Sequence, residues 1–368
     1  MGPSVSVAVL AENRPGERRV ALVPEVAGRL RARGFRSAIA AGAGRRSFFH
    51  DALYKTAAIQ VKTDPVDGAE VLLSVRPPAV EIARRLGPGT LTISFLPVRE
   101  EGELIRVLRD RGVTALALDL LPRISRAQSM DALTSQALVV GYRGALVAAE
   151  RLPRFLPGLH TAAGTLPPAR VLVLGAGVAG LQAIATARRL GAQVAGYDVR
   201  VSSAEEIRSV GAAFLDLGLD PLQGAAGYAR RLDPERAARQ QDLLAPHVAA
   251  ADALITAAAV PGQDAPVLVT RAMVEAMRPG SVVVDLAAEA GGNVEGVRAG
   301  AEQIVSPGVL LWGGAEVASQ LPTHASRMFA HNVVSLLDYM GPEGVRSPDL
   351  TDEIVGACWV THDGKVRR

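Results

Sequence analysis

Residues 171–180 read Val-Leu-Val-Leu-Gly-Ala-Gly-Val-Ala-Gly, and this stretch decides the fold of the chain around it. Its four leading apolar residues are typical of a short buried strand, and a helical pattern follows through position 190. Gly175, Gly177 and Gly180 have the spacing of the Rossmann dinucleotide fingerprint, which has meaning between a strand and a helix. Gly175 permits the tight turn, Gly177 lets the backbone approach a pyrophosphate, and Gly180 lets the helix pack closely on the sheet. The free N–H groups at the helix start then face the phosphates.

An acidic residue follows the next predicted strand, residues 193–197. Asp198 lies 18 residues after Gly180, where a carboxylate binds the adenosine ribose hydroxyls and repels a 2′-phosphate. The pattern therefore predicts NAD(H) rather than NADP(H), although Arg200 weakens this prediction because an arginine there can hold a 2′-phosphate. The candidate cofactor-binding residues are Gly175, Ala176, Gly177, Val178, Ala179, Gly180, Asp198, Val199 and Arg200, with Ala259 and Val260 after a later strand.

Short apolar runs alternate with helical patterns along most of the chain, which favours parallel sheets. Strands are predicted at 4–10, 37–41, 70–75, 90–96, 113–118, 171–174, 193–197, 253–257, 281–286 and 308–312. Helices are predicted at 24–33, 101–111, 132–150, 178–190, 204–210, 271–277 and 320–338. We expect an α/β fold of two Rossmann-like, doubly wound parallel-sheet domains with a cleft between them. Residues 1–131 and 314–368 would form a discontinuous first domain, and residues 132–313 the NAD(H)-binding domain.

Residues 218–245 do not fit this alternation. Glycines at 218, 224 and 227 loosen the segment, and residues 230–241 are strongly charged. A long polar insertion in a compact domain is usually a functional lid or a disordered segment. The sequence leaves both possibilities open.

Composition excludes several classes of protein. The 40 basic and 37 acidic residues are mixed along the chain, which argues against a nucleic-acid-binding stripe. Cys358 is the single cysteine, so an intrachain disulfide and a multi-thiolate metal site are excluded, and the scattered histidines suggest no metal site. The N-terminus lacks the pattern of a signal peptide, and no run reaches the ~18 apolar residues of a membrane span. We expect a soluble, cytoplasmic protein.

Residues 122–131, Pro-Arg-Ile-Ser-Arg-Ala-Gln-Ser-Met-Asp, resemble a segment of the NAD(H)-binding α subunit of proton-translocating nicotinamide nucleotide transhydrogenases. The resemblance covers nearly the whole chain and includes residues 14–21, 175–180, 197–200, 227–229, 283–289 and 325–329. It implies Re/Si-specific hydride transfer between NAD(H) on this chain and NADP(H) on a partner subunit, coupled to proton movement through membrane-embedded subunits. It also implies a homodimer that is peripheral on the inner membrane through its partner subunits.

The same resemblance assigns Arg123, Gln128 and Asp131 to the nicotinamide end of the site. The resemblance also implies that Thr134 and Tyr228 bind the cofactor. Thr134 stands where a serine is expected and keeps the hydroxyl, and Tyr228 would lie on a mobile loop that closes on bound NAD(H). Hydride transfer between nicotinamides needs no general acid or base, so these residues would set ring distance and orientation. Without the resemblance, Asp131 is a helix N-cap in a polar loop.

Two alternatives stay open. The chain also resembles the alanine dehydrogenases, which use a lysine and a histidine of the N-terminal domain on their substrate. Arg76 stands near the position of that lysine, and Phe95 near that of the histidine. Arginine stays protonated near neutral pH, and phenylalanine has no proton to exchange, so the proton chemistry is missing. Arg18 or Arg19 could still bind the carboxylate of a substrate. The other alternative is a non-catalytic NAD-binding regulatory module. Residues 123–131 argue against it, because such a module needs no loop that docks a second nucleotide.

Overall fold

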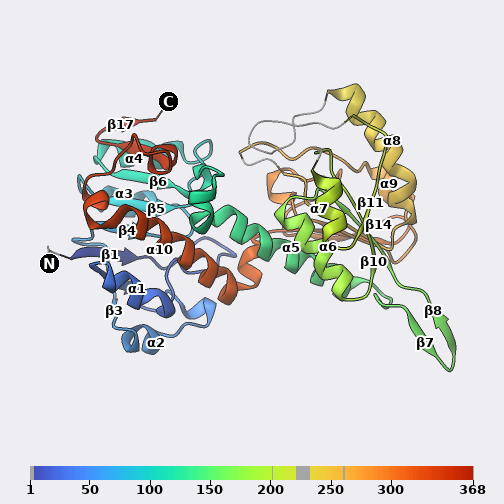
Figure 1. Ribbon diagram of the computed structural model, residues 1–368, viewed down its shortest axis with the longest axis horizontal. Coiled ribbons are helices and arrows are strands. Elements are labelled where there is room, and N and C mark those ends of the chain that lie inside the picture. Colours follow the sequence, from blue (N-terminus) through green and yellow to red (C-terminus); the bar gives the residue numbers. More distant parts are fainter. Residues whose placement is uncertain (1–3, 201, 221–232, 260–261, 368) are drawn as a thin grey trace. The chain divides into compact units, whose positions relative to one another are not determined.

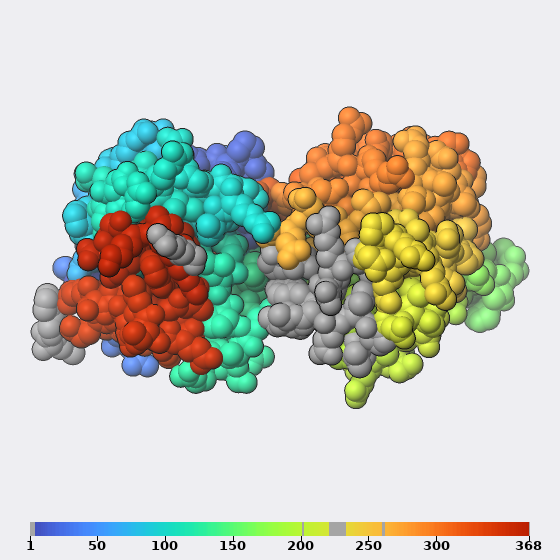
Figure 2. Space-filling view, turned by 90° about the horizontal axis from the view of Figure 1, so that it is seen from above, coloured from blue at the N-terminus to red at the C-terminus, as the bar shows by residue number. Residues whose placement is uncertain are grey.

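The computed structural model describes residues 4–200, 202–220, 233–259 and 262–367. The chain divides into two compact units, Met1–Gln136 with Ser319–Arg368, and Ala137–Ala318 (Figure 1). The first unit is therefore built from two separate stretches, and Figure 2 shows the C-terminal residues in red on the body formed by the N-terminal residues. The boundaries lie five residues beyond those expected, at 136 rather than 131 and at 318 rather than 313.

The sheet of the first unit has the strand order β17-β16-β6-β5-β4-β1-β2-β3. Strands β1 to β6 are parallel, and β16 and β17 add an antiparallel edge. The parallel strands thus follow the order 3-2-1-4-5-6 of a doubly wound fold. Their bounds are β1 (Val5–Val9), β2 (Phe35–Ala40), β3 (Gln60–Lys62), β4 (Val71–Leu73), β5 (Leu91–Ser94), β6 (Thr114–Ala117), β16 (Trp359–His362) and β17 (Lys365–Val366).

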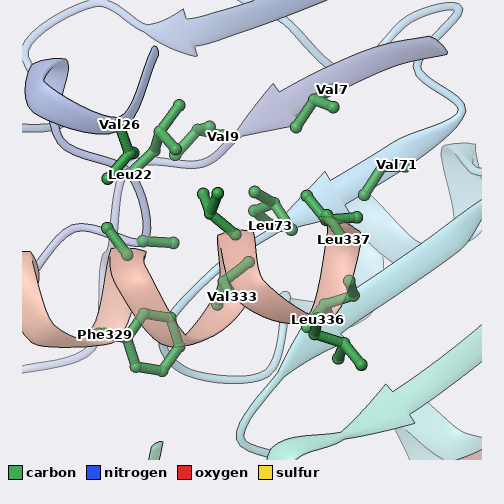
Figure 3. Close-up of a cluster of buried hydrophobic side chains, with 14 of the residues drawn as sticks. Val7, Val9, Leu22, Val26, Val71, Leu73, Phe329, Val333, Leu336 and Leu337 are labelled. Carbon is green, nitrogen blue, oxygen red and sulfur yellow. The ribbon is translucent and has the colours of Figure 1, made fainter. Parts of the chain in front are cut away.

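Both faces of this sheet carry a hydrophobic core, because successive strand residues point to opposite faces. Figure 3 shows the first core, where α10 lies across β1 and β4 with Phe329, Val333, Leu336 and Leu337 packed near Val7, Val9, Val71 and Leu73. On the other face, Ala8 and Leu72 pack in a cluster with Leu104 and Leu108. The helices of this unit are α1 (Ala27–Ala32), α2 (Asp51–Thr56), α3 (Val80–Arg85), α4 (Gly102–Asp110), α10 (Pro322–Arg346) and α11 (Val355–Cys358), with the short 3-10 helices η1 (Pro24–Val26), η2 (Arg45–Ser47), η3 (Leu118–Leu120) and η4 (Ser125–Met130).

The second unit repeats the same plan. Its sheet has the order β11-β10-β9-β12-β13-β15-β14, in which β14 runs antiparallel to its neighbour and the other strands are parallel. The strands are β9 (Arg170–Leu174), β10 (Gln193–Tyr197), β11 (Ala213–Phe214), β12 (Ala253–Thr256), β13 (Val282–Asp285), β14 (Glu302–Val305) and β15 (Val309–Gly313). The helices are α6 (Val178–Arg189), α7 (Ser203–Ser209), α8 (Pro234–Ala250) and α9 (Arg271–Glu275), and α5 (Ala132–Arg151) runs into this unit from the first. The predicted α/β class with two doubly wound sheets is confirmed.

Residues 234–245 of the segment 218–245 belong to helix α8 and are therefore neither a lid nor disordered, whereas residues 221–232 lie outside the described residues. Helix α8 begins after Asp233, whose carboxylate accepts a hydrogen bond from the Arg236 N–H at 2.9 Å, as an N-cap does. Leu244 and Val248, one turn apart, are fully buried in the core under β9 and β12. The buried stripe of α8 is narrow and lies among charged residues, so the sequence shows no clear helical periodicity there.

Several shorter elements were not predicted. Residues 152–168, for which the sequence predicts no strand or helix, contain the hairpin β7 (Leu159–Thr161) and β8 (Gly164–Leu166). The sequence also does not predict the edge strands β3, β11, β14 and β17, the strand β16 next to the edge, or the helices α2, α3 and α11. The helix predicted at 320–338 extends to Arg346 across a non-helical Gly341 with φ of 64°.

A partly buried carboxylate joins the two central strand ends of the first sheet. Glu12, which follows β1, accepts hydrogen bonds from the backbone N–H groups of Val75 at 2.5 Å and Arg76 at 3.3 Å, which follow β4. Burial, together with the nearby negative charge of Glu17, outweighs these hydrogen bonds and raises the pKa of Glu12 to about 7. The folded chain therefore holds a proton at Glu12 that the unfolded chain releases near pH 4.5.

We predict that Glu12→Gln removes part of the pH dependence of stability. Because the folded pKa of Glu12 is raised, its contribution is complete below the unfolded value of 4.5 and is lost as the pH rises through about 7. The wild type should therefore lose stability relative to the variant over this interval, by on the order of 3 kcal/mol at most. Urea unfolding at several pH values measures the difference, with the exposed Glu81→Gln as control. A constant difference between wild type and Glu12→Gln from acid to alkaline pH would contradict the prediction.

Candidate functional site

The three fingerprint glycines differ in their backbone conformation and surroundings. Gly175 has φ of 92°, in the left-handed region that glycine enters freely. A Cβ on Gly180, in the first turn of α6, would lie 1.7 Å from the carbonyl oxygen of Gly175, so only glycine fits. A Cβ on Gly177 would have no neighbour within 4 Å. The fold therefore requires Gly175 and Gly180, whereas Gly177 leaves open space in front of the helix.

The N-terminus of α6 faces this space. Gly177 is the N-cap and has no side chain that could satisfy the first N–H groups of the helix, and no residue of the first turn is acidic. The Leu181 N–H donates to the Gly177 carbonyl at 2.8 Å, which leaves the earlier Val178 and Ala179 at the open end. Such a terminus attracts anions through its N–H groups and dipole.

The glycine turn lies at the topological switch point of the sheet. Strands β9 and β12 are neighbours, with Leu174 paired to Thr256, and their following helices lie on opposite faces. In open α/β sheets, ligands bind outside the carboxyl ends of the strands at such a point. The residues after β12, Ala257 to Ala259, have small side chains, and a Cβ on Gly175 would lie 2.7 Å from the backbone nitrogen of Ala258.

Asp198 binds the fingerprint loop directly. Its Oδ2 accepts a hydrogen bond from the Ala176 N–H at 2.7 Å, and its Oδ1 accepts from the N–H and Nε of Arg200, both at 3.0 Å. Arg200 Nη2 also donates to the Ala176 carbonyl at 2.8 Å and to Glu206 at 3.4 Å. Val199, between them, is half-buried. The guanidinium is thus shared by two carboxylates, and the three charged side chains together carry one negative charge.

Two residues that the sequence did not single out support the loop after β12. The Asn293 side chain accepts from the Ala258 N–H at 3.0 Å and donates to the Ala258 carbonyl at 2.8 Å. Asp285, at the end of β13, is fully buried and accepts from the N–H groups of Ala287, Asn293 and Val294 at 2.7–2.9 Å. Burial raises the pKa of Asp285, against these hydrogen bonds. Asp285 lies inside the motif at 283–289, so that motif was the one available signal.

Residues 123–131 form an ordered segment of the first unit. Ala127 and Met130 of η4 are buried against the core that contains α10, and Asn332 of α10 donates to the Ser129 carbonyl at 2.9 Å. Arg123 and Gln128 have exposed side chains.

The Asp131 carboxylate accepts from the Thr134 N–H at 2.9 Å and from its hydroxyl at 2.6 Å. Asp131 is therefore the N-cap of α5, as the sequence predicts without the family resemblance. Thr134 contributes its hydroxyl to this cap.

The residues considered for amino-acid chemistry are engaged elsewhere. Phe95 is buried, with its ring centroid 5.4 Å from that of Phe329. Arg76 Nε donates to the buried Glu17 at 3.2 Å. Arg19 is 4% exposed and donates through Nε and Nη2 to Glu17 and through Nη1 to Gln136, whereas Arg18 is exposed.

Some expectations concern residues that are not described or properties of the chain as a whole. Tyr228 and Val260 lie outside the described residues. Among the residues that are described, no cluster of histidine, cysteine, aspartate and glutamate could hold a metal ion. Over the same residues, every helix is too short or too polar to cross a membrane.

The sequence matches two models of one protein family and several characterised relatives. Alanine dehydrogenase/PNT, N-terminal domain, matches residues 8–140, and alanine dehydrogenase/PNT, C-terminal domain, matches residues 144–368. An NAD(P) transhydrogenase subunit alpha chain of Rhodospirillum rubrum is 39% identical over 98% of this chain and 97% of its own length. Alanine dehydrogenase of Bacillus subtilis is 32% identical over 79% of this chain and 72% of its own length.

A solved structure agrees over nearly the full length. The transhydrogenase from Sinorhizobium meliloti superposes with a TM-score of 0.85 at 40% identity and covers 98% of both chains. Together with the two matched domain models, this similarity shows that the chain belongs to the alanine dehydrogenase/PNT family.

Proposed function

We propose that this chain is the NAD(H)-binding subunit of a proton-translocating transhydrogenase and exchanges hydride directly with NADP(H) on a partner subunit. The observation that carries the proposal is the open N-terminus of α6 at the switch point, in a chain that aligns over nearly its full length with a transhydrogenase α chain. The residues present fit a dinucleotide. Gly177 leaves room for the pyrophosphate at the helix N-terminus, and Asp198 lies beside it for the ribose.

The charge around Arg200 supports NAD(H) over NADP(H). Asp198 and Glu206 both bind the guanidinium, so the arginine that could hold a 2′-phosphate is already neutralised. A phosphate placed there would meet a net negative charge, whereas ribose hydroxyls can donate to Asp198. The presence of Arg200 is therefore compatible with a preference for NAD(H).

The nicotinamide supplies the hydride chemistry when the cofactor is bound, and the protein needs only to orient it. On the resemblance, we assign orientation to Arg123, Gln128 and Asp131. The exposed Gln128 amide offers both a donor and an acceptor for a carboxamide or for the second nucleotide. Asp131 holds the start of α5 through Thr134, so it can act by fixing the segment. The proposed partners are NADP(H)-binding and membrane-embedded subunits and a second copy of this chain.

The alanine dehydrogenase alternative has less support. The alanine dehydrogenase of Bacillus subtilis matches at 32% identity, against 39% for the transhydrogenase chain of Rhodospirillum rubrum. Phe95 and Arg76 supply no proton chemistry, since one is packed in the core and the other is a guanidinium bound to Glu17.

Reconstitution with a partner tests the proposal. The purified chain is assayed alone and then with an NADP(H)-binding transhydrogenase subunit, following reduction of an NAD⁺ analogue by NADPH. We expect turnover only with the partner, and none with NAD⁺ plus alanine. Turnover of alanine by the chain alone would contradict the proposal. NADH binding without turnover in either assay would instead indicate a regulatory module.

We predict that Gly177→Ala weakens NADH binding at least about tenfold, or about 1.4 kcal/mol. The new Cβ fills the space left for the pyrophosphate, while the φ of −67° suits alanine and no protein atom lies within 4 Å. The free energy of unfolding should therefore change by less than about 0.5 kcal/mol. NADH fluorescence titration and urea unfolding measure the two quantities. Gly180→Ala is the contrasting variant and should destabilise the second unit, because its Cβ would lie 1.7 Å from the Gly175 carbonyl oxygen. Unchanged NADH affinity in Gly177→Ala would disprove that the pyrophosphate binds at Gly177.

We predict that Asp198→Ser combined with Glu206→Gln raises the ratio of NADPH to NADH affinity by about 10- to 100-fold. The two changes remove both carboxylates from Arg200, and a hydrogen bond to a charged group is worth about 1.5–3 kcal/mol. Equilibrium titrations with both nucleotides measure the ratio. Glu206→Gln alone serves as control and should give a smaller rise, because Asp198 still binds Arg200 at 3.0 Å. A ratio that does not change in the double variant would argue against Asp198 as the ribose residue.

A further inference from the structure

The chain passes between the two units twice, and both crossings are tied to one buried ion pair. It leaves the first unit after Gln136 and returns at Ser319. Glu17 and Arg19, in the loop after β1, bind these two residues. All four side chains are buried, with exposed fractions of 0% for Glu17, 4% for Arg19, 6% for Gln136 and 1% for Ser319.

A chain of hydrogen bonds links the ion pair to both connections. Arg19 donates to Glu17 through Nε at 2.8 Å and Nη2 at 2.6 Å, and through Nη1 to the Gln136 side chain at 2.9 Å. The Ser319 hydroxyl donates to Glu17 Oε1 at 2.5 Å. Gln136 Nε2 in turn donates to the Ala325 carbonyl, at 3.1 Å, in the first turns of α10. The outgoing helix α5 and the returning segment are therefore bound both to the pair and to each other.

A contribution to stability does not by itself explain the buried Glu17–Arg19 ion pair. A buried ion pair often contributes no more than apolar side chains of the same volume, although removal of one partner is costly. The hydrogen bonds and the positive charge of Arg19, with the Ser319 hydroxyl, overcome burial and lower the pKa of Glu17 to about 2. Glu17 is therefore ionised at physiological pH, and its hydrogen bonds have fixed directions. What the pair adds beyond burial is a defined geometry at the two residues where the chain changes unit.

We propose that Glu17 and Arg19 are a positioning pair that anchors both connections between the units and thereby maintains the geometry that hydride transfer requires. This inference rests on the proposed function. The two residues touch neither nucleotide in this scheme and act through Gln136 and Ser319. Arg76 Nε, on Glu17 Oε2 at 3.2 Å, adds the loop after β4 to the same anchor.

The test loosens the anchor without leaving a charge unpaired. Glu17→Gln would strand Arg19 as a buried cation and is expected to unfold the unit, so the variants used are Ser319→Ala, Gln136→Leu and their combination. Thr361→Val is the matched control, because it removes another buried hydroxyl hydrogen bond of the first unit, to the Val113 carbonyl at 2.8 Å.

Three measurements are made on the full chain: amide hydrogen exchange, NADH affinity, and kcat with the NADP(H)-binding partner. We expect exchange at residues 137–140 and 317–319 to rise about fivefold per lost hydrogen bond, with little change in β1 to β6. NADH affinity should stay within about twofold of wild type, because Gly177 and Asp198, the proposed pyrophosphate and ribose residues, lie in the other unit. The kcat should fall at least about fivefold, since misplacement by about 1 Å can cost up to ~100-fold.

The outcomes separate the anchor from the proposed function. Exchange raised evenly across the first unit, or no more than in Thr361→Val, would overturn the anchor and leave the pair as ordinary core. Raised exchange at both connections with an unchanged kcat would overturn its positioning role. If the wild type itself shows no transhydrogenation with the partner, the proposed function fails, while hydrogen exchange still decides whether the two connections are anchored.

Discussion

The second unit depends on the close approach of three backbones at the end of β9. Helix α6 begins so near the strand that a Cβ on Gly180 would lie 1.7 Å from the Gly175 oxygen. Helix α5 crosses at the same place, where a Cβ on Gly141 would lie 2.0 Å from the Ala179 carbonyl oxygen. These contacts hold the N-terminus of α6 at the carboxyl end of β9, and no side chain caps it. The open space at Gly177 is therefore a consequence of how the helices pack, and its attraction for anions follows from the helix dipole.

The central elements could be predicted because their signals are local. Each of the ten predicted strands occurs, since buried strands such as β9 and β12 are continuous apolar runs. The missed strands lie at or near sheet edges and are short and partly exposed: β11 has two residues, and β14 alternates exposed Glu302 and Ile304 with half-buried neighbours. Helix α8 was missed for a related reason, because only one narrow stripe of it is buried. Elements that bury little surface leave little trace in hydrophobic periodicity.

The site divides in the same way. The glycines and Asp198 lie within 24 residues of one another in sequence, and their spacing alone predicts a nucleotide-binding turn. The residues that support the site pair over long separations: Asn293 with Ala258, 35 positions away, and Glu17 with Ser319, 302 positions away. No pattern in a single sequence reveals such pairs. Asp131 lies between the two cases, because its capping of α5 was local and predictable, whereas its assignment to the nicotinamide rests on resemblance.

The two units also show why topology alone does not decide which of them binds a dinucleotide. Both sheets have the order 3-2-1-4-5-6 and therefore a switch point between the first and fourth strands. In the second unit a glycine turn and a helix N-terminus occupy that point. In the first unit the loop after β1 carries Glu12 and Glu17, and Arg19 is already bound to Glu17. A pyrophosphate there would face carboxylates whose nearest cations are engaged, and no Gly-x-Gly-x-x-Gly turn follows β1. On the two proposals made above, the same architecture serves as a nucleotide crevice in one unit and as a structural anchor in the other, through the side chains placed at the strand ends.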